Sequence, residues 1–344
     1  MKGREIILEE RADGTTAAAL RVDGRLEDLL ADPPPGDVAL RPEAIYVARA
    51  GRALKSAGGM ILDLGEDRTG FLRGGALPAH GSLVLVQVAG WTEPPKAARV
   101  TTRVRLRGRG AVLTPGAAGI GISRSIAEKD LRERLAACAA EAMSGAEPDC
   151  GLILRSVAGE IPIDELSSEI ARLRQDWHRI DSAASKPGLA HPGPDSRAVA
   201  LREWDLPGTA VTSEPGAFDS TGILDDLALA TPKRVPLETG AMTIEATAAL
   251  VAVDVDTDGA TSPAAGLRAN RAAMTELPRQ LRLRGLGGQI VIDMAPTPKE
   301  QRAQVERALS AALRGDPVPT DIAGWTNLGH LELSRRNDRR PISL

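Results

Sequence analysis

Two short apolar runs carry aspartates whose spacing suits metal chemistry, namely Asp254, Asp256 and Asp293. The first run, residues 250–260, reads LVAVDVDTDGA, and the second, residues 289–294, reads QIVIDM. Strand residues two apart point to one face, so Asp254 and Asp256 share a face, and Asp293 alternates with Ile292 in the same way. Carboxylate oxygens are hard ligands that suit Mg²⁺ better than zinc. These acidic side chains are therefore candidate metal ligands.

The segment between the two runs predicts how the strands are arranged. Residues 270–288 read NRAAMTELPRQLRLRGLGG, which is a helical pattern of the length that a βαβ crossover needs. A right-handed crossover brings Asp254 and Asp293 to the same edge of a sheet. Pro278 interrupts this pattern and removes a backbone hydrogen bond, so we expect it to kink the crossover helix.

A calcium loop is the alternative for the same residues. DVDTDG matches the opening of an EF-hand loop, but the twelfth position is Ala265, where a bidentate Glu is needed. The preceding residues also predict a strand and not a helix. Acidic residues at strand ends commonly begin turns or cap helices. Spacing alone therefore leaves both a structural role and a phosphodiester-activating metal pair open.

Alternating arginines are the clearest candidate contact for a polyanion. Arg103, Arg105, Arg107 and Arg109 occupy every second position, so an extended strand would carry four guanidinium groups on one face. This pattern is typical of surfaces that bind nucleic acid, and a solvated outer sheet face is the alternative. Because aromatic residues make up only 2% of the chain, base stacking cannot extend over a wide platform.

Length, charge and cysteine content limit the class of protein. A chain of 344 residues can form two or three compact units, and its net charge of -3 does not by itself indicate a nucleic-acid binder. The two cysteines, Cys138 and Cys150, favour a reducing compartment over a disulfide framework. The charged start MKGREIILEE predicts neither a signal peptide nor a membrane span. We therefore expect a cytoplasmic protein.

Turn residues and periodicity divide the chain. Residues 2–30 predict a strand pair, and short strands with glycine punctuation between Arg41 and Pro115 predict a small barrel. Helical periodicity follows at Ser125–Met143 and Ile163–Ala183. Thr297 is expected to cap the last helix, in a capping box with Glu300 three residues on.

The longest motif resembles one known family. RQLRLRGLGGQIVID, together with VAVDVD and GHLELSRR, closely resembles the catalytic region of the bacterial ribonuclease E/G family of single-strand endoribonucleases. AIYVARAGRAL, LDLGEDRTGFL, GISRSI and GLILRSVAG follow that family's order. The resemblance covers nearly the whole chain and is weakest from about Ala198 to Leu237. It implies a magnesium-dependent enzyme that cleaves single-stranded RNA, leaving a 5′-phosphate and a 3′-hydroxyl, in RNA processing such as mRNA decay or rRNA processing.

The resemblance also implies a multidomain fold that mixes α+β and α/β parts. The implied domains are an RNase H-like domain at residues 1–36 and 186–245, an OB-fold RNA-binding barrel at 37–115, a small α/β 5′-phosphate sensor at 116–185, and a DNase I-like α/β catalytic domain at 246–344.

Site residues follow from the same resemblance, position by position. Asp254 and Asp293 match the two magnesium ligands, and Asp256, where the family usually has Asn, joins them as a catalytic residue. Expected RNA contacts are Phe71, Lys96, Arg103, Arg105 and Arg107. The implied 5′-phosphate pocket comprises Gly108, Val112, Arg124, Arg155 and Ser156.

Departures from the family's pattern suggest an unusual member. Ile61 stands where a second stacking aromatic is expected, and Asn327 replaces the last pocket arginine, so sensing of the 5′ end is expected to be weak or absent. The family's zinc-link cysteine pair is missing. We therefore expect no zinc and a monomer or a homodimer without a zinc link. The alternative function is an RNA-binding paralogue with weak or no catalytic activity.

Overall fold

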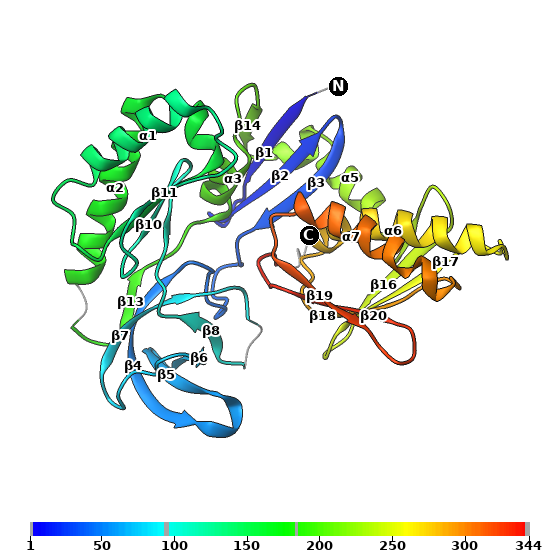
Figure 1. Ribbon diagram of the computed structural model, residues 1–344, viewed down its shortest axis with the longest axis horizontal. Helices are drawn as coiled ribbons and strands as arrows, with labels where there is room; N and C mark the ends of the chain where they lie inside the picture. Colours follow the sequence, from blue (N-terminus) through cyan, green and yellow to red (C-terminus); the bar gives the residue numbers. More distant parts are fainter. Residues whose placement is uncertain (1–2, 93–95, 183–184, 341–344) are drawn as a thin grey trace. The chain divides into compact units, whose positions relative to one another are not determined.

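The computed structural model describes residues 3–92, 96–182 and 185–340. The chain forms two compact units, each considered by itself below. One combines Met1–Pro35 with Thr209–Leu344, and the other is Gly36–Gly208. Each contains both strands and helices, so the mixed fold class is confirmed (Figure 1). No helix in the described ranges is long and apolar enough to cross a membrane.

A closed barrel of five strands occupies the first half of the Gly36–Gly208 unit. The strands are β4 (Ile45–Leu54), β5 (Gly59–Gly65), β6 (Arg68–Arg73), β7 (Leu83–Val88) and β8 (Ala98–Thr101), with a 3-10 turn at Lys55–Ala57. Their order is β4-β5-β6-β8-β7, and β7 pairs with β4 to close the barrel. The β6–β8 pair is parallel and the other neighbours are antiparallel. This architecture is consistent with the predicted OB-like domain.

A small four-stranded sheet follows in the same unit. Its order is β11-β12-β10-β9, formed by β9 (Leu106–Arg107), β10 (Ala111–Thr114), β11 (Ile120–Ile122) and β12 (Gly151–Leu154). Helices α1 (Lys129–Ala142) and α2 (Ile163–Ser182) pack against it through a shared buried cluster. A 3-10 turn (Ser156–Glu160), β13 (Gly188–His191) and α3 (Ser196–Trp204) complete the unit.

The helix predicted from Ser125 begins four residues later, at Lys129. Ile126 is buried, and its backbone N–H donates to the Ser123 carbonyl in a turn. Its apolar side chain fits the helical pattern although the residue precedes the helix, so the predicted start is too early.

The other unit begins with a sheet that joins distant parts of the chain. Its order is β14-β1-β2-β3, with β1 (Arg4–Glu10), β2 (Thr16–Val22), β3 (Arg25–Ala31) and β14 (Ala210–Glu214). The predicted strand pair at residues 2–30 is therefore a meander of three strands. The short helices α4 (Ala217–Ser220) and α5 (Ile223–Ala230) pack on it through a buried apolar cluster.

A six-stranded mixed sheet carries the two aspartate runs. Its order is β15-β16-β17-β18-β20-β19, in which β17 (Val251–Asp256) and β18 (Gly288–Asp293) are the only parallel pair in the described sheet. The remaining strands are β15 (Arg234–Pro236), β16 (Ala241–Ala246), β19 (Thr320–Trp325) and β20 (Leu331–Arg335). Helix α6 (Pro263–Leu283) makes the crossover, and α7 (Arg302–Arg314) packs beside it.

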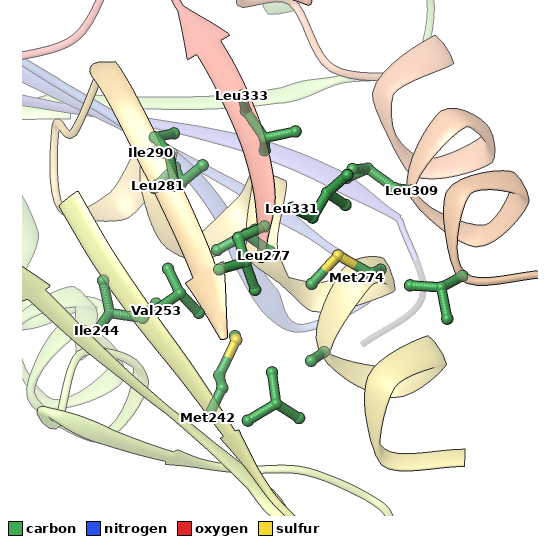
Figure 2. Close-up of a cluster of buried hydrophobic side chains, with 14 of the residues drawn as sticks. Met242, Ile244, Val253, Met274, Leu277, Leu281, Ile290, Leu309, Leu331 and Leu333 are labelled. Atoms are coloured by element: carbon green, nitrogen blue, oxygen red, sulfur yellow. The ribbon is translucent and has the colours of Figure 1, made fainter. Parts of the chain in front are cut away.

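The core beneath this sheet explains why the crossover helix tolerates a proline. Figure 2 shows Leu277 and Leu281 of α6 among side chains of β17, β18 and β20. Pro278 lies between them in the sequence, is itself buried, and does not end the helix. Burying leucine side chains contributes about 1.5–3 kcal/mol each, which is comparable with the roughly 3 kcal/mol cost of a proline in a helix interior.

The capping box predicted at Thr297 is wrong. A 3-10 turn occupies Lys299–Gln301, and α7 starts only at Arg302 with no side-chain cap. The Thr297 hydroxyl instead accepts from the amide of the buried Asn270 at 2.7 Å, so a tertiary contact takes the group that the local pattern assigned to capping.

Two of the three arginines in the RQLRLR motif hold α6 against the first sheet of its unit. Arg279 Nε donates to the Leu26 carbonyl at 2.6 Å, and Arg282 Nε donates to the Glu27 carbonyl at 3.1 Å. Arg282 also binds Asp316, whose fully buried carboxylate accepts from it at 2.7 Å. These cations are therefore structural and do not form an exposed basic patch.

Asp316 is the critical member of this network. Its second partner is Arg335, whose Nη2 lies 3.1 Å from Asp316 Oδ1, and both side chains are almost completely buried. Removing one member of a buried ion pair leaves the other charges uncompensated, at a cost of about 3–5 kcal/mol.

We predict that Asp316→Ala lowers the free energy of unfolding of this unit by about 3–5 kcal/mol in urea titrations, because Arg282 and Arg335 lose their shared counter-ion. Asp321→Ala is the matched control, since Asp321 is exposed on the adjacent β19. Equal stability of the two variants would contradict a structural role for Asp316.

Candidate active site and RNA-binding residues

The parallel ladder places Asp254 directly opposite Asp293. Their Cα positions are paired in the β17–β18 register, and both carboxylates are exposed. Val253 and Ile292, one position earlier in each strand, are buried in the core. Adjacent strands lie about 4.8 Å apart, so two carboxylates paired in this way project from neighbouring positions on one face. The structure thus brings together the two residues that the sequence selected.

Neither of these aspartates is neutralised by a strong cation. In the part of the chain that the structure describes, no Lys or Arg side chain forms an ion pair with Asp254 or Asp293. His330 Nδ1 lies 3.3 Å from Asp293 Oδ1, outside hydrogen-bond geometry, and is otherwise without a partner. No local pattern in the sequence marks His330, because the pairing of β18 with β20 brings it to the site.

Asp256 has a different environment. Its Oδ1 accepts the backbone N–H of Asp258 at 2.8 Å, and its Oδ2 lies 3.9 Å from Arg234 Nη2. Arg234 also pairs closely with Asp258. Arg234 of β15 therefore partly balances the negative charge that Asp256 adds at the end of β17.

The donor set fits magnesium better than zinc. Mg²⁺ is commonly held by one or two carboxylates and keeps several waters, whereas structural zinc sites use four Cys or His ligands. Asp254 and Asp293 supply two exposed carboxylates. The described residues contain no group of three or more His, Cys, Asp and Glu side chains that could hold a metal ion.

The candidate stacking residue lies on the outer surface of the barrel. Phe71 pairs with Ile61 on one side and Arg99 on the other, in three neighbouring strands. Phe71 and Ile61 are partly exposed, and Arg99 is exposed. A Cβ built on Gly59 would come within 2.6 Å of the Phe71 ring, so glycine allows the ring to lie close to the strand. Lys96, the other predicted contact, is also exposed.

Three of the four alternating arginines are exposed as the alternation predicts, although only Arg107 lies in a strand, β9. Arg103, Arg105 and Arg107 are exposed, while the intervening Val104 and Leu106 are buried. Arg109 is the exception, because its Nη2 donates to the Asp205 carbonyl at 2.9 Å and its side chain is partly buried. The predicted four-arginine face therefore contains three exposed arginines.

The principal cation of the predicted 5′-phosphate pocket is already paired. Arg155 binds the Glu203 carboxylate and donates to the Gly108 carbonyl at 3.1 Å. Glu203 also accepts from Arg202 at 2.8 Å, and Arg202 in turn holds Glu43. Burial alone would raise the pKa of Glu203, but Arg202 and Arg155 outweigh it and lower that pKa. The carboxylate that faces Arg155 is therefore charged at neutral pH.

The backbone donors beside this pocket are occupied too. Glu169 accepts the N–H groups of Arg109, Gly110 and Ala111 at 3.1, 2.9 and 2.9 Å. A Cβ on Gly108 would lie only 2.3 Å from Glu169 Oε1, so this glycine leaves room for the carboxylate.

The remaining residues of the predicted 5′-phosphate pocket are mostly exposed. Arg124 and Ser156 are exposed, Val112 is half-buried on β10, and Asn327 is exposed in the turn between β19 and β20 of the other unit. Neither acid is marked by a local sequence signal, because Glu169 is one of several acids on α2 and Glu203 is a single acid near the end of the short helix α3.

Comparisons with known proteins agree with the resemblance seen in the motifs. The model of the Ribonuclease E/G family matches residues 105–206 and 206–338. The chain is 27% identical to ribonuclease G of Escherichia coli K12, over 87% of this chain and 73% of that protein. It is 30% identical to ribonuclease E of a Nostoc species, over 75% of this chain and 43% of that protein. The chain belongs to the ribonuclease E/G family.

Proposed function

We propose that this protein is a magnesium-dependent endoribonuclease that cleaves single-stranded RNA and leaves a 5′-phosphate and a 3′-hydroxyl. Membership of the ribonuclease E/G family supports the endoribonuclease role. The observation that carries the metal assignment is the direct pairing of Asp254 with Asp293 on parallel strands, with both carboxylates exposed. We assign the enzyme to RNA processing or decay in the cytoplasm, as a monomer or a homodimer without a zinc link.

The roles of the protein's own groups follow from their positions. Asp254 and Asp293 would hold the cation, which when bound polarises a phosphodiester and lowers the pKa of coordinated water. Fixing both aspartates in a strand ladder supports the preorganised geometry that such electrostatic catalysis needs. Phe71 would stack on a base, and Arg103, Arg105 and Arg107 would neutralise backbone phosphates.

Discrimination of the RNA 5′ end is expected to be weak. A phosphate entering the predicted pocket must displace Glu203 from Arg155, and the lowered pKa of Glu203 keeps that competing charge in place. Glu169 likewise occupies the neighbouring backbone donors. Asn327, in place of an expected arginine, supports the same conclusion.

The second candidate function is RNA binding with little or no catalysis. It is favoured by Asp256, whose additional charge stands beside the proposed metal ligands, and by Asn327. RNA binding without a metal-dependent product would support this alternative.

The first prediction concerns the carboxylate pair. Asp254→Asn and Asp293→Asn should each reduce cleavage of a labelled single-stranded RNA by about a hundredfold or more, because several kcal/mol of charge stabilisation is lost. Affinity for RNA should change little. The control Asp321→Asn makes the same charge change at an exposed position of that unit. Cleavage at the unaltered rate by either active-site variant would refute the assignment.

The second prediction concerns the metal. Cleavage should disappear with a chelator and return with Mg²⁺, whereas Zn²⁺ should be a poor substitute because the site offers only carboxylate ligands. A titration of each ion against product formation measures this. Full activity in chelator would exclude a metal-dependent reaction.

The third prediction concerns the 5′ end. The unaltered protein should cleave 5′-monophosphate and 5′-hydroxyl RNA at similar rates, and Glu203→Gln should favour the 5′-monophosphate by about tenfold, since a charge-assisted bond to Arg155 becomes available. Glu133→Gln, an exposed change on α1, controls for net charge. If Glu203→Gln leaves the rate ratio of the two RNAs unchanged, Glu203 does not block the pocket.

A further inference from the structure

A groove outside the predicted 5′-phosphate pocket combines positive charge with exposed apolar surface. It has a volume of about 570 Å³ and is lined by residues 102–105, 114–121 and 152–153, all within the Gly36–Gly208 unit. Its volume lies within the roughly 300–1,000 Å³ of typical small-molecule sites. The lining includes Arg103 and Arg105, and no Asp or Glu occurs among the described residues that form it.

The two arginines of the groove are held in place through their backbone. The Arg105 N–H donates to the side chain of Gln87 at 3.0 Å, and the Gln87 amide donates back to the Arg105 carbonyl at 3.0 Å. Gln87 is buried, and its side chain hydrogen-bonds both backbone groups of Arg105 as a neighbouring strand would. These two bonds hold the Arg105 backbone in place. Throughout residues 3–92, 96–182 and 185–340, no carboxylate forms an ion pair with Arg103 or Arg105. Both cations are therefore available to a ligand.

The opposite wall is a tight loop packed on β12. The Leu152 N–H donates to the Gly119 carbonyl at 2.9 Å, and the Ala117 N–H donates to the Thr114 carbonyl at 3.1 Å. A Cβ on Gly151 would lie 2.0 Å from the Ala117 carbonyl oxygen, so only glycine permits this approach. Because the loop is fastened to the strand, the groove is largely preformed.

Two isoleucines provide the apolar part of the groove. Ile120 and Ile153 are 44% and 45% exposed, and they occupy adjacent strands, where Gly121 pairs with Ile153. A single exposed isoleucine is unremarkable. Both isoleucines line the groove, but Ile120 pairs with Leu152, so the two side chains leave opposite faces of the sheet. Ile153 beside the two arginines forms a surface that suits a ligand with both an anionic and an apolar part.

We propose that this groove is a subsite for one nucleotide of single-stranded RNA. Arg103 and Arg105 would bind its phosphate, and Ile153 would contact its base. RNA is favoured because a nucleotide combines these two chemical parts in a volume that the groove can hold. The assignment rests on the proposed function and deepens it, because it places two of the expected RNA-binding arginines in one groove with an apolar side chain, separate from Arg155.

Binding should be tested in the full chain carrying Asp254→Asn, so that cleavage does not interfere. A fluorescent single-stranded oligonucleotide is titrated at several salt concentrations. The double change Arg103→Gln and Arg105→Gln should weaken binding about tenfold or more and reduce the slope of log affinity against log salt by about 0.7 for each arginine removed. Ile153→Glu should also weaken binding, because it places a negative charge inside the groove.

The matched control replaces Arg134 and Arg172, two exposed helical arginines of the same unit, with Gln. Equal losses in the control and in the Arg103/Arg105 variant would overturn the subsite, since only general charge would then matter. An unchanged affinity in Ile153→Glu would overturn it as well. AMP that binds as tightly as the oligonucleotide would point to a free-nucleotide site and contradict the RNA assignment. Failure of magnesium-dependent cleavage would refute the catalytic proposal alone, because this readout is binding.

Discussion

The parallel pairing of β17 with β18 is the constraint on which the proposed active site depends. Parallel neighbours cannot be joined by a tight turn, so the chain must cross over through α6. The same register that buries Val253 and Ile292 exposes Asp254 and Asp293 beside one another. Because side chains alternate along a strand, a slip of one residue would bury the acids and expose the core. Core packing therefore fixes the geometry of the carboxylate pair.

Arginines of the crossover helix α6 have a structural role that the sequence pattern does not reveal. Arg279 and Arg282 would be natural candidates for contacts to RNA, yet they bind the carbonyl groups of β3, and Arg282 also binds the buried Asp316. A buried arginine needs a counter-ion for its positive charge and hydrogen-bond acceptors for most of its N–H groups. The RQLRLR motif thus includes arginines that stabilise the fold around the proposed site and do not contribute to the site itself.

Charge in the other unit is sorted into compensated and available groups. Arg155 and Arg109 face Glu203 and Asp205, whereas Arg103 and Arg105 have no carboxylate partner within the described residues. A net charge of -3 therefore conceals local positive surface. Since an anion binds best where no internal carboxylate competes, this distribution supports the proposal that the protein contacts the RNA backbone and discriminates its 5′ end weakly.

The sequence by itself determined the elements whose signals are local. Alternation identified both aspartate strands and the exposed Arg103 and Arg105, and the family motif correctly predicted a mixed fold with an OB-like barrel. Only the tertiary structure decided which charges are free, because Glu203 reaches Arg155 across 48 positions of sequence and His330 reaches Asp293 through strand pairing. Packing likewise decided that Thr297 does not cap its helix. Periodicity reports which face a residue occupies, whereas partners depend on distant segments that no local pattern specifies.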